Sequence, residues 1–163
     1  MSLSPDQIER IEAALDCGDP RNELPRLVDA LQTPAELHVF ATNYNVNDGL
    51  RPIWRVIRHP QCDLGTAVFL YWHFADIVEE RAEDRQQVSD DHRDVAGLIR
   101  EIEDRVAGDR FDSKTIAFDP RAHLEWNRIS EYRFQKAVAA GTLTYPPRMI
   151  DPTPGEPGPE FPN

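Results

Sequence analysis

Hydrophobic residues along the first two-thirds of the chain recur every three to four positions, which is the spacing of one face of a helix. The strict alternation of a half-buried strand is hard to find. Ser4 and Gln7, with Pro5 between them, have the outline of a capping box, and Thr33 and Glu36 repeat it before a second apolar run. The pattern therefore predicts an all-α fold.

Seven segments combine this spacing with a capping or helix-stopping residue. Apolar residues lie almost all round the first half of the fifth segment, so we expect it to be central. The sixth has only a narrow apolar stripe, so we expect it to be peripheral and solvated. The predicted helices cover about residues 5–18, 23–31, 34–44, 52–58, 64–78, 90–108 and 120–141.

The C-terminal residues have a different composition. From Thr144 onward the chain contains seven prolines and two glycines, which preclude a core-forming element. We expect residues 144–163 to be an extended tail, either wrapped on the surface or disordered, and residues 111–118 to form a short extended segment. Residues 1–143 are then a single helical domain, a compact bundle or short α-solenoid-like stack of about six to seven helices.

Charge narrows the choice of partners. The 163 residues include 29 acids and 18 bases, a formal net charge of −11, which repels a phosphate backbone and favours a basic protein partner. The two cysteines lie in dissimilar contexts, and no signal peptide or membrane-length apolar run is recognisable. We therefore expect free thiols in a cytoplasmic protein that binds neither nucleic acid nor a membrane.

The most unusual local stretch is NYNVNDG, residues 43–49, which we call the asparagine loop. Asn43, Asn45 and Asn47 alternate as calcium ligands do. A calcium loop, however, needs glycine at its sixth position and glutamate at its twelfth, where this chain has Asp48 and Trp54. A structural turn is the favoured interpretation, because Asn and Asp side chains bond to their own backbone.

The turn HPQCD follows shortly afterwards. His59, Cys62 and Asp63 resemble one half of a zinc site, but the second ligand pair is missing, so we predict no metal and no cofactor. Cys62 precedes a helix start, where the helix dipole favours a thiolate nucleophile. We favour a buried cysteine, because the sequence places no histidine as its base.

Three arginines, Arg51, Arg55 and Arg58, fall on one face of the predicted fourth helix; we call them the arginine strip. Such a strip is suited to a carboxylate, a phosphate or an acidic surface. The favoured interpretation is pairing with acids of the same chain, such as Glu79 and Glu80 or Glu83 and Asp84, because acids are abundant here.

The stretches NYNVNDGL and IRHPQCDLGTAVFLYW together resemble the bacterial domain-of-unknown-function family numbered 4274, over about residues 34–75. This chain departs from the family pattern at Val46, where an aromatic residue is usual, and at Asn47, where an acid is usual. The resemblance implies a fold unit and no catalytic activity. The helix stop at His-Pro also has weak similarity to leucine-rich-variant and HEAT-like repeats, which mostly bind proteins.

Two functions are consistent with these features. The preferred one is a non-catalytic acidic interaction module, such as an immunity or regulatory protein that binds a more basic partner. The alternative is a small-molecule or enzymatic site formed by the asparagine loop, the arginine strip and the HPQCD turn. Its candidate residues are Asn43, Asn45, Asn47, Asp48, Arg51, Arg55, Arg58, His59, Cys62 and Asp63.

Overall fold

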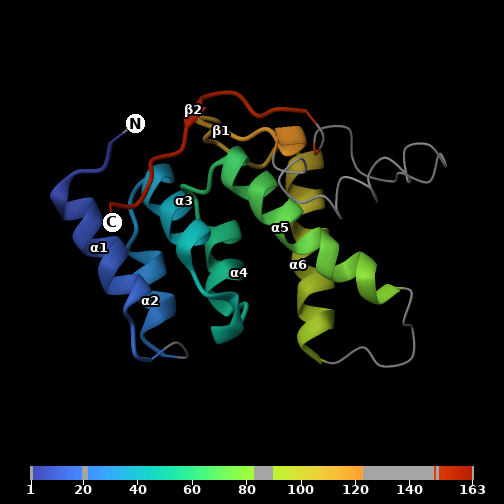
Figure 1. The fold of residues 1–163 in the computed structure, drawn as a ribbon, viewed down its shortest axis with the longest axis horizontal. Coiled ribbons are helices and arrows are strands. Elements are labelled where there is room, and N and C mark those ends of the chain that lie inside the picture. Colours follow the sequence, from blue (N-terminus) through green and yellow to red (C-terminus); the bar gives the residue numbers. More distant parts are fainter. Residues whose placement is uncertain (1, 20–21, 83–89, 123–148, 150, 163) are drawn as a thin grey trace.

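A computed structural model describes residues 2–19, 22–82, 90–122, 149 and 151–162, with the backbone alone described for 75–82 and 90–93 (Figure 1). Helices dominate this part of the chain, as the sequence predicts, and one small parallel sheet accompanies them. The helices are α1 (Pro5–Leu15), α2 (Leu24–Asp29), α3 (Pro34–Asn43), the 3-10 helix η1 (Val46–Asp48), α4 (Arg51–Arg58), α5 (Leu64–Ala82) and α6 (Asp90–Ala107). The strands are β1 (Ile116–Ala117) and β2 (Glu156–Pro157).

The first four helices pack mainly on the helix two positions away in the chain, whereas α5 packs mainly on α6. α1 contacts α2 and α3, α2 contacts α4, α3 contacts α4 and α5, and α5 contacts α6. In Figure 1, α1 and α2 lie at the left, α3 and α4 in the middle, and α5 crosses α6 toward the right. The result is the compact helical arrangement that the hydrophobic spacing predicts.

α5 is central because apolar residues surround its first half. Ala67, Val68, Leu70, Tyr71 and Phe74 are all at most 1% exposed. α6 buries a single stripe, as predicted, while Asp94, Arg100 and Asp104 of the same helix are exposed. The buried stripe consists of Val95, Leu98, Ile99, Ile102 and Val106.

The first helix is shorter than predicted. The sequence places its end at Gly18, but α1 ends at Leu15 and its C-cap is Asp16. Gly18 is not among the glycines with positive φ, which are Gly49 and Gly155, so it does not form the left-handed cap by which glycine usually ends a helix.

The first predicted capping box forms, whereas at α3 the Thr33 side chain caps Glu36 N but the Glu36 carboxylate turns to other donors and joins two helices. The Glu36 carboxylate is fully buried and accepts hydrogen bonds from Thr33 Oγ1 (2.7 Å), Gln32 N (3.1 Å) and Arg10 Nε of α1 (2.6 Å). Burial raises the pKa of Glu36, but these hydrogen bonds and the Arg10 charge outweigh it and hold the pKa below 4.5. The ionised carboxylate thereby fixes α1 against α3.

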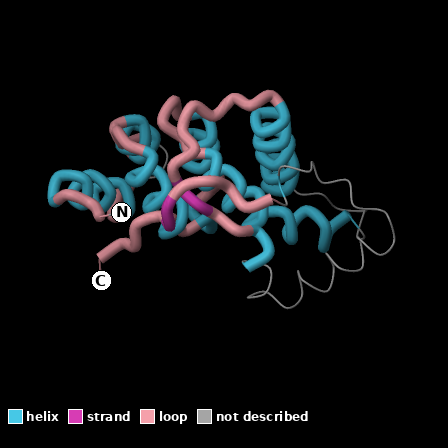
Figure 2. Tube along the Cα trace, turned by 90° about the horizontal axis from the view of Figure 1, so that it is seen from above, coloured by secondary structure: helices cyan, strands magenta, loops and turns pink. Residues whose placement is uncertain are grey.

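The C-terminal tail is extended and lies on the helices (Figures 1 and 2). Its described part begins at Met149, which is fully buried and whose carbonyl oxygen accepts a hydrogen bond from Trp72 Nε1 of α5 at 2.7 Å. β2 then pairs with β1, and the chain continues to Phe161, which packs partly against the core. Of the two predicted alternatives, the described residues 151–162 follow the first and wrap on the surface. Most of the predicted helix over 120–141 falls outside the described residues.

Candidate functional site

The HPQCD turn leads into a buried carboxylate at the start of α5. Asp63 is 0% exposed, and its Oδ1 accepts a hydrogen bond from Gly65 N at 2.8 Å, as expected of the N-cap that the sequence predicts. Its Oδ2 accepts from Ser113 Oγ (2.6 Å) and Thr115 N (2.7 Å), and Oδ1 accepts from Ile116 N (3.3 Å). Asp63 therefore holds residues 113–116 against the helix.

β1 lies unusually close to this helix end. A Cβ at Gly65 would overlap the carbonyl oxygen of Ile116, so glycine is required there for close approach. The same carbonyl accepts a hydrogen bond from Thr153 Oγ1 at 2.9 Å. Phe118 N in turn donates to Thr153 Oγ1 at 2.7 Å. Asp63, Gly65 and Thr153 thus fasten α5, β1 and the tail together, which is a structural role.

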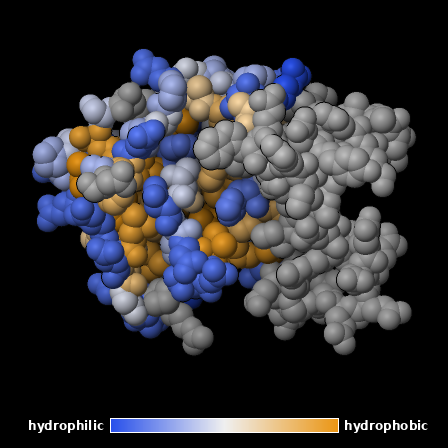
Figure 3. All heavy atoms as spheres, viewed as in Figure 1, coloured by the Kyte–Doolittle hydropathy of each residue, from blue (hydrophilic) through white to orange (hydrophobic). Residues whose placement is uncertain are grey.

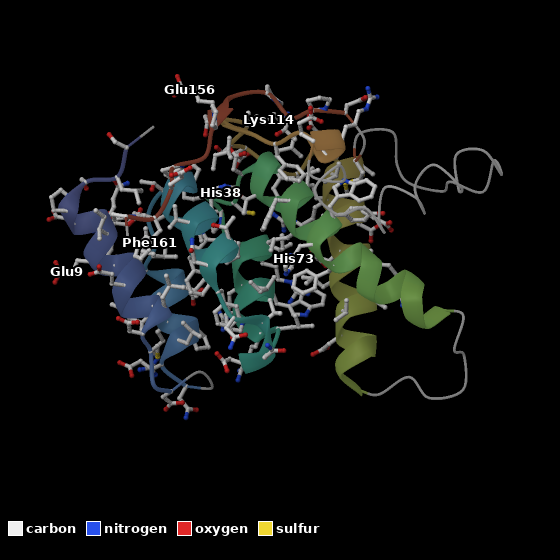
Figure 4. The ribbon with its side chains drawn as sticks, in the orientation of Figure 1. Glu9, His38, His73, Lys114, Glu156 and Phe161 are labelled. Atoms are coloured by element: carbon white, nitrogen blue, oxygen red, sulfur yellow. The ribbon has the colours of Figure 1, made fainter. Side chains whose placement is uncertain are left out.

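The tail next passes over His38 of α3. His38 Nδ1 lies 3.1 Å from the buried hydroxyl of Thr66, and a Cβ at Gly158 would overlap the imidazole ring. Figure 4 labels His38 below the strand pair, near the path of the tail. Burial lowers the pKa of His38 below 6.5, and the charge of Asp63 opposes this only in part. The imidazole is therefore held in its neutral form.

This burial predicts a pH-dependent stability. As pH falls through 6.5, the unfolded chain takes up a proton on His38 before the folded chain does, so the free energy of unfolding decreases on acidification. Above that pH the contribution is fully present. Urea denaturation at about pH 7.5 and about pH 5.5 should show that His38→Gln loses less stability than the native chain on acidification. Equal losses in the two proteins would contradict this assignment.

Cys62 is the least suited of the candidates to chemistry. It is 1% exposed, and burial raises the pKa of its thiol to about 12. Since the thiolate is the reactive form, this cysteine is a packing residue, as the sequence analysis favours. His59, three residues earlier, accepts a hydrogen bond from Gln61 N at 3.1 Å through Nδ1, which shapes the turn.

A thiol-labelling experiment checks this conclusion. Cys17 is half-buried whereas Cys62 is buried, so a disulfide reagent at neutral pH should label Cys17 first and label Cys62 only after denaturant is added. Cys17→Ser should abolish the rapid phase in the folded protein. Rapid labelling that persists in this variant would show an accessible Cys62.

The side chains of the asparagine loop bond largely within the loop or to the end of α3. Asn45 Oδ1 accepts from the backbone N of Asn47 at 3.2 Å and from its Nδ2 at 3.0 Å. Asn43 Nδ2 donates to Val39 O at 2.8 Å. Asp48 is exposed and does not cap α4. The arrangement is that of a turn built by asparagine amides.

The arginine strip occupies the exposed side of α4, opposite the buried Ile53, Val56 and Ile57. Arg55 pairs with Asp29 of α2 at 3.0 Å, and Arg58 lies 3.7 Å from Glu101 of α6. Arg55 and Arg58 therefore pair with acids of the same chain, but with Asp29 and Glu101; the side chains at 79–80 and 83–84, which the sequence suggested as partners, lie outside the described part of the structure. The strip also lines a hollow of about 580 Å³ between α4 and α6, which we call the α4–α6 hollow; its lining is Arg51, Trp54, Arg55, Arg58 and Asp94.

The family model described as "Domain of unknown function (DUF4274)" matches residues 32–107. These residues form a DUF4274 domain. The match extends well beyond the motifs at 34–75 and includes α3, α4, α5 and α6. No curated protein and no solved structure matches the chain.

The DUF4274 domain does not gather all the predicted site residues in one place. Only the arginine strip lines the α4–α6 hollow; the asparagine loop, His59, Cys62 and Asp63 do not. Within the described residues, no group of three His, Cys, Asp or Glu side chains is arranged to hold a metal ion. Among those same residues, no helix is both long and apolar enough to cross a membrane.

Two lining residues of the hollow were missed by the sequence analysis. Trp54 is only half-buried, and its position in the sequence between Arg51 and Arg55 is the signal that could have placed it beside the strip. Asp94 belongs to the solvated side of α6, where nothing in the sequence distinguishes it from the other acids of that helix.

Proposed function

We propose that this protein is a non-catalytic interaction module whose acidic surface binds a more basic protein partner. The observation that carries the proposal is the outer side of α1, where four carboxylates are exposed: Asp6, Glu9, Glu12 and Asp16. We call this set the acidic face of α1. Figure 3 shows polar side chains at the outer edge of the molecule over α1, and Figure 4 labels Glu9 there.

The acidic face is well placed for a partner. On the opposite side of α1, Ile11 and Ala14 are buried and Arg10 is engaged by Glu36, so the helix is held firmly by its inner side. The Arg10–Glu36 ion pair lies on this inner side and leaves the acidic face open. Carboxylates that are exposed and close together produce a negative potential that steers a basic surface into contact.

α1 lies outside the DUF4274 domain, so the proposed binding surface is an addition to the family unit. An immunity or regulatory protein of the bacterial cytoplasm fits this arrangement, because such a protein acts by occupying a basic surface of its partner. Two free cysteines accord with a reducing compartment.

Affinity capture from a native lysate at low and high salt tests the proposal. The native chain should retain one stoichiometric partner at low salt and release it at high salt. A variant carrying Asp6→Asn, Glu9→Gln, Glu12→Gln and Asp16→Asn should not retain it. The matched control neutralises four exposed acids elsewhere, Asp48, Asp104, Asp112 and Asp151, and should still bind.

Equal retention by the two variants would show that α1 is not the surface. A salt-insensitive complex, or a native chain that retains no stoichiometric partner, would overturn the electrostatic interaction itself.

A further inference from the structure

The α4–α6 hollow is independent of the acidic face of α1, and charged side chains line it around one tryptophan. Its volume of about 580 Å³ falls within the range of small-molecule pockets. One wall carries the arginine strip and Trp54, and the other carries Asp94. Among the side chains that the structure describes there, the two walls therefore carry opposite charge.

The cationic wall is fixed by the packing of α4. Because Ile53, Val56 and Ile57 are fully buried, the helix cannot rotate, and the strip must face outward. The Arg58 guanidinium lies 4.4 Å from the centre of the Trp54 ring, a cation–π contact that limits its movement. The Trp54 ring packs against Gly97 of α6. A Cβ added at Gly97 would lie 3.4 Å from Cζ2 of Trp54.

The ion pairs of the strip are weak enough for a ligand to compete with them. The Arg55 and Asp29 side chains are 47% and 46% exposed, and the Arg58–Glu101 distance of 3.7 Å is long for a hydrogen bond. Exposed pairs of this kind contribute about 0–1 kcal/mol. An oxyanion bound by two guanidinium groups replaces such contacts with charge-assisted hydrogen bonds.

Asp94 restricts the ligand further. Its exposed carboxylate repels a bare polyanion but attracts an ammonium group. We propose that the α4–α6 hollow binds a small zwitterion, with a carboxylate or phosphate against the arginine strip and an amine against Asp94. An amino acid or a phosphorylated amine has this chemistry.

Nuclear magnetic resonance of the full chain tests the site with four probes. The Trp54 indole N–H signal is assigned by its loss in Trp54→Phe. L-phenylalanine carries both a carboxylate and an ammonium group. 3-Phenylpropionate carries only the carboxylate, and phenethylamine carries only the ammonium group. Inorganic phosphate tests whether the oxyanion is a phosphate instead of a carboxylate. L-phenylalanine should shift the Trp54 signal at about tenfold lower concentration than 3-phenylpropionate, since a hydrogen bond to a charged group is lost without the amine.

Three variants test which wall of the hollow binds which charged group of the ligand. Arg58→Gln should weaken L-phenylalanine binding about tenfold. Asp94→Asn should make L-phenylalanine and 3-phenylpropionate bind equally. Asp29→Asn removes the carboxylate that competes for Arg55 and should tighten both ligands. Arg100→Gln, an exposed arginine of α6 that does not line the hollow, is the control and should change nothing.

The responses to the probes identify the type of oxyanion and decide whether the site exists. A phosphate response that exceeds the 3-phenylpropionate response identifies the oxyanion as a phosphate, and the reverse identifies a carboxylate. A Trp54 signal that none of the four probes shifts would overturn the proposal, as would shifts that Arg58→Gln leaves unchanged in a protein with native melting.

Discussion

Replacing Gly65 with alanine is expected to lower the melting temperature sharply and to detach β1 and the C-terminal tail from α5. The new methyl group would overlap the carbonyl oxygen of Ile116 and lie 3.1 Å from Thr153 Oγ1. The obstacle is backbone held by Asp63, so it cannot rotate away as a side chain does. Overpacking of this kind costs about 3 kcal/mol. Thermal denaturation measures the loss, and amide exchange at Ile116 and Thr153 reports the detachment.

Gly18→Ala is the matched control, because nothing lies within 4 Å of a Cβ at that position. It should melt near the native temperature. If Gly65→Ala and Gly18→Ala melted alike, the close approach of β1 to α5 would be disproved.

The second large effect is expected for Asp63→Asn. The carboxylate accepts from Gly65 N, Ser113 Oγ, Thr115 N and Ile116 N, whereas an asparagine amide presents an NH2 group to some of these donors. At least one buried donor then loses its acceptor, at about 1–3 kcal/mol for each. Urea denaturation should show a loss of about 3 kcal/mol in total.

Asp112→Asn changes the same charge at an exposed position one residue before Ser113 and should be nearly neutral. A native midpoint for Asp63→Asn would mean that the carboxylate is not structural, and would return Asp63 to the candidates for ligand binding.

Asp63 also shows which part of a residue's role can be predicted from the sequence. Its position before an apolar helix predicted the N-cap, because capping is a local interaction between neighbours in the chain. Its other partners lie 50 to 53 residues later, in a segment with no periodic pattern. The burial that makes Asp63 structural therefore could not be read from the motif, and the residue remained among the candidate site residues.

The helices were predictable for the opposite reason. The stripe of α6 and the apolar surround of α5 are encoded in residues three and four positions apart, and each is buried as expected. In the tail, proline content predicted extension. It did not predict the strand pairing of Glu156 or the burial of Met149, since both depend on distant parts of the chain.

The α4–α6 hollow could be predicted from the sequence only in part. Helical spacing alone placed Arg51, Arg55 and Arg58 on one face. The opposite charge of Asp94 and the partners Asp29 and Glu101 belong to other helices, so only the packing of α4 against α2 and α6 brings them together. A charge pattern along one helix therefore predicts one wall of a pocket and not the pocket.

The fastening of α5 has a consequence for the order in which the chain acquires its structure. α5 leaves the ribosome long before its partners, since the Ser113 hydroxyl is 50 residues from Asp63 and the Met149 carbonyl is 77 residues from Trp72. Contacts so distant in sequence slow folding, because a long loop must close before they form. During synthesis the DUF4274 domain is complete as a sequence but still lacks the strand and the tail that enclose its central helix.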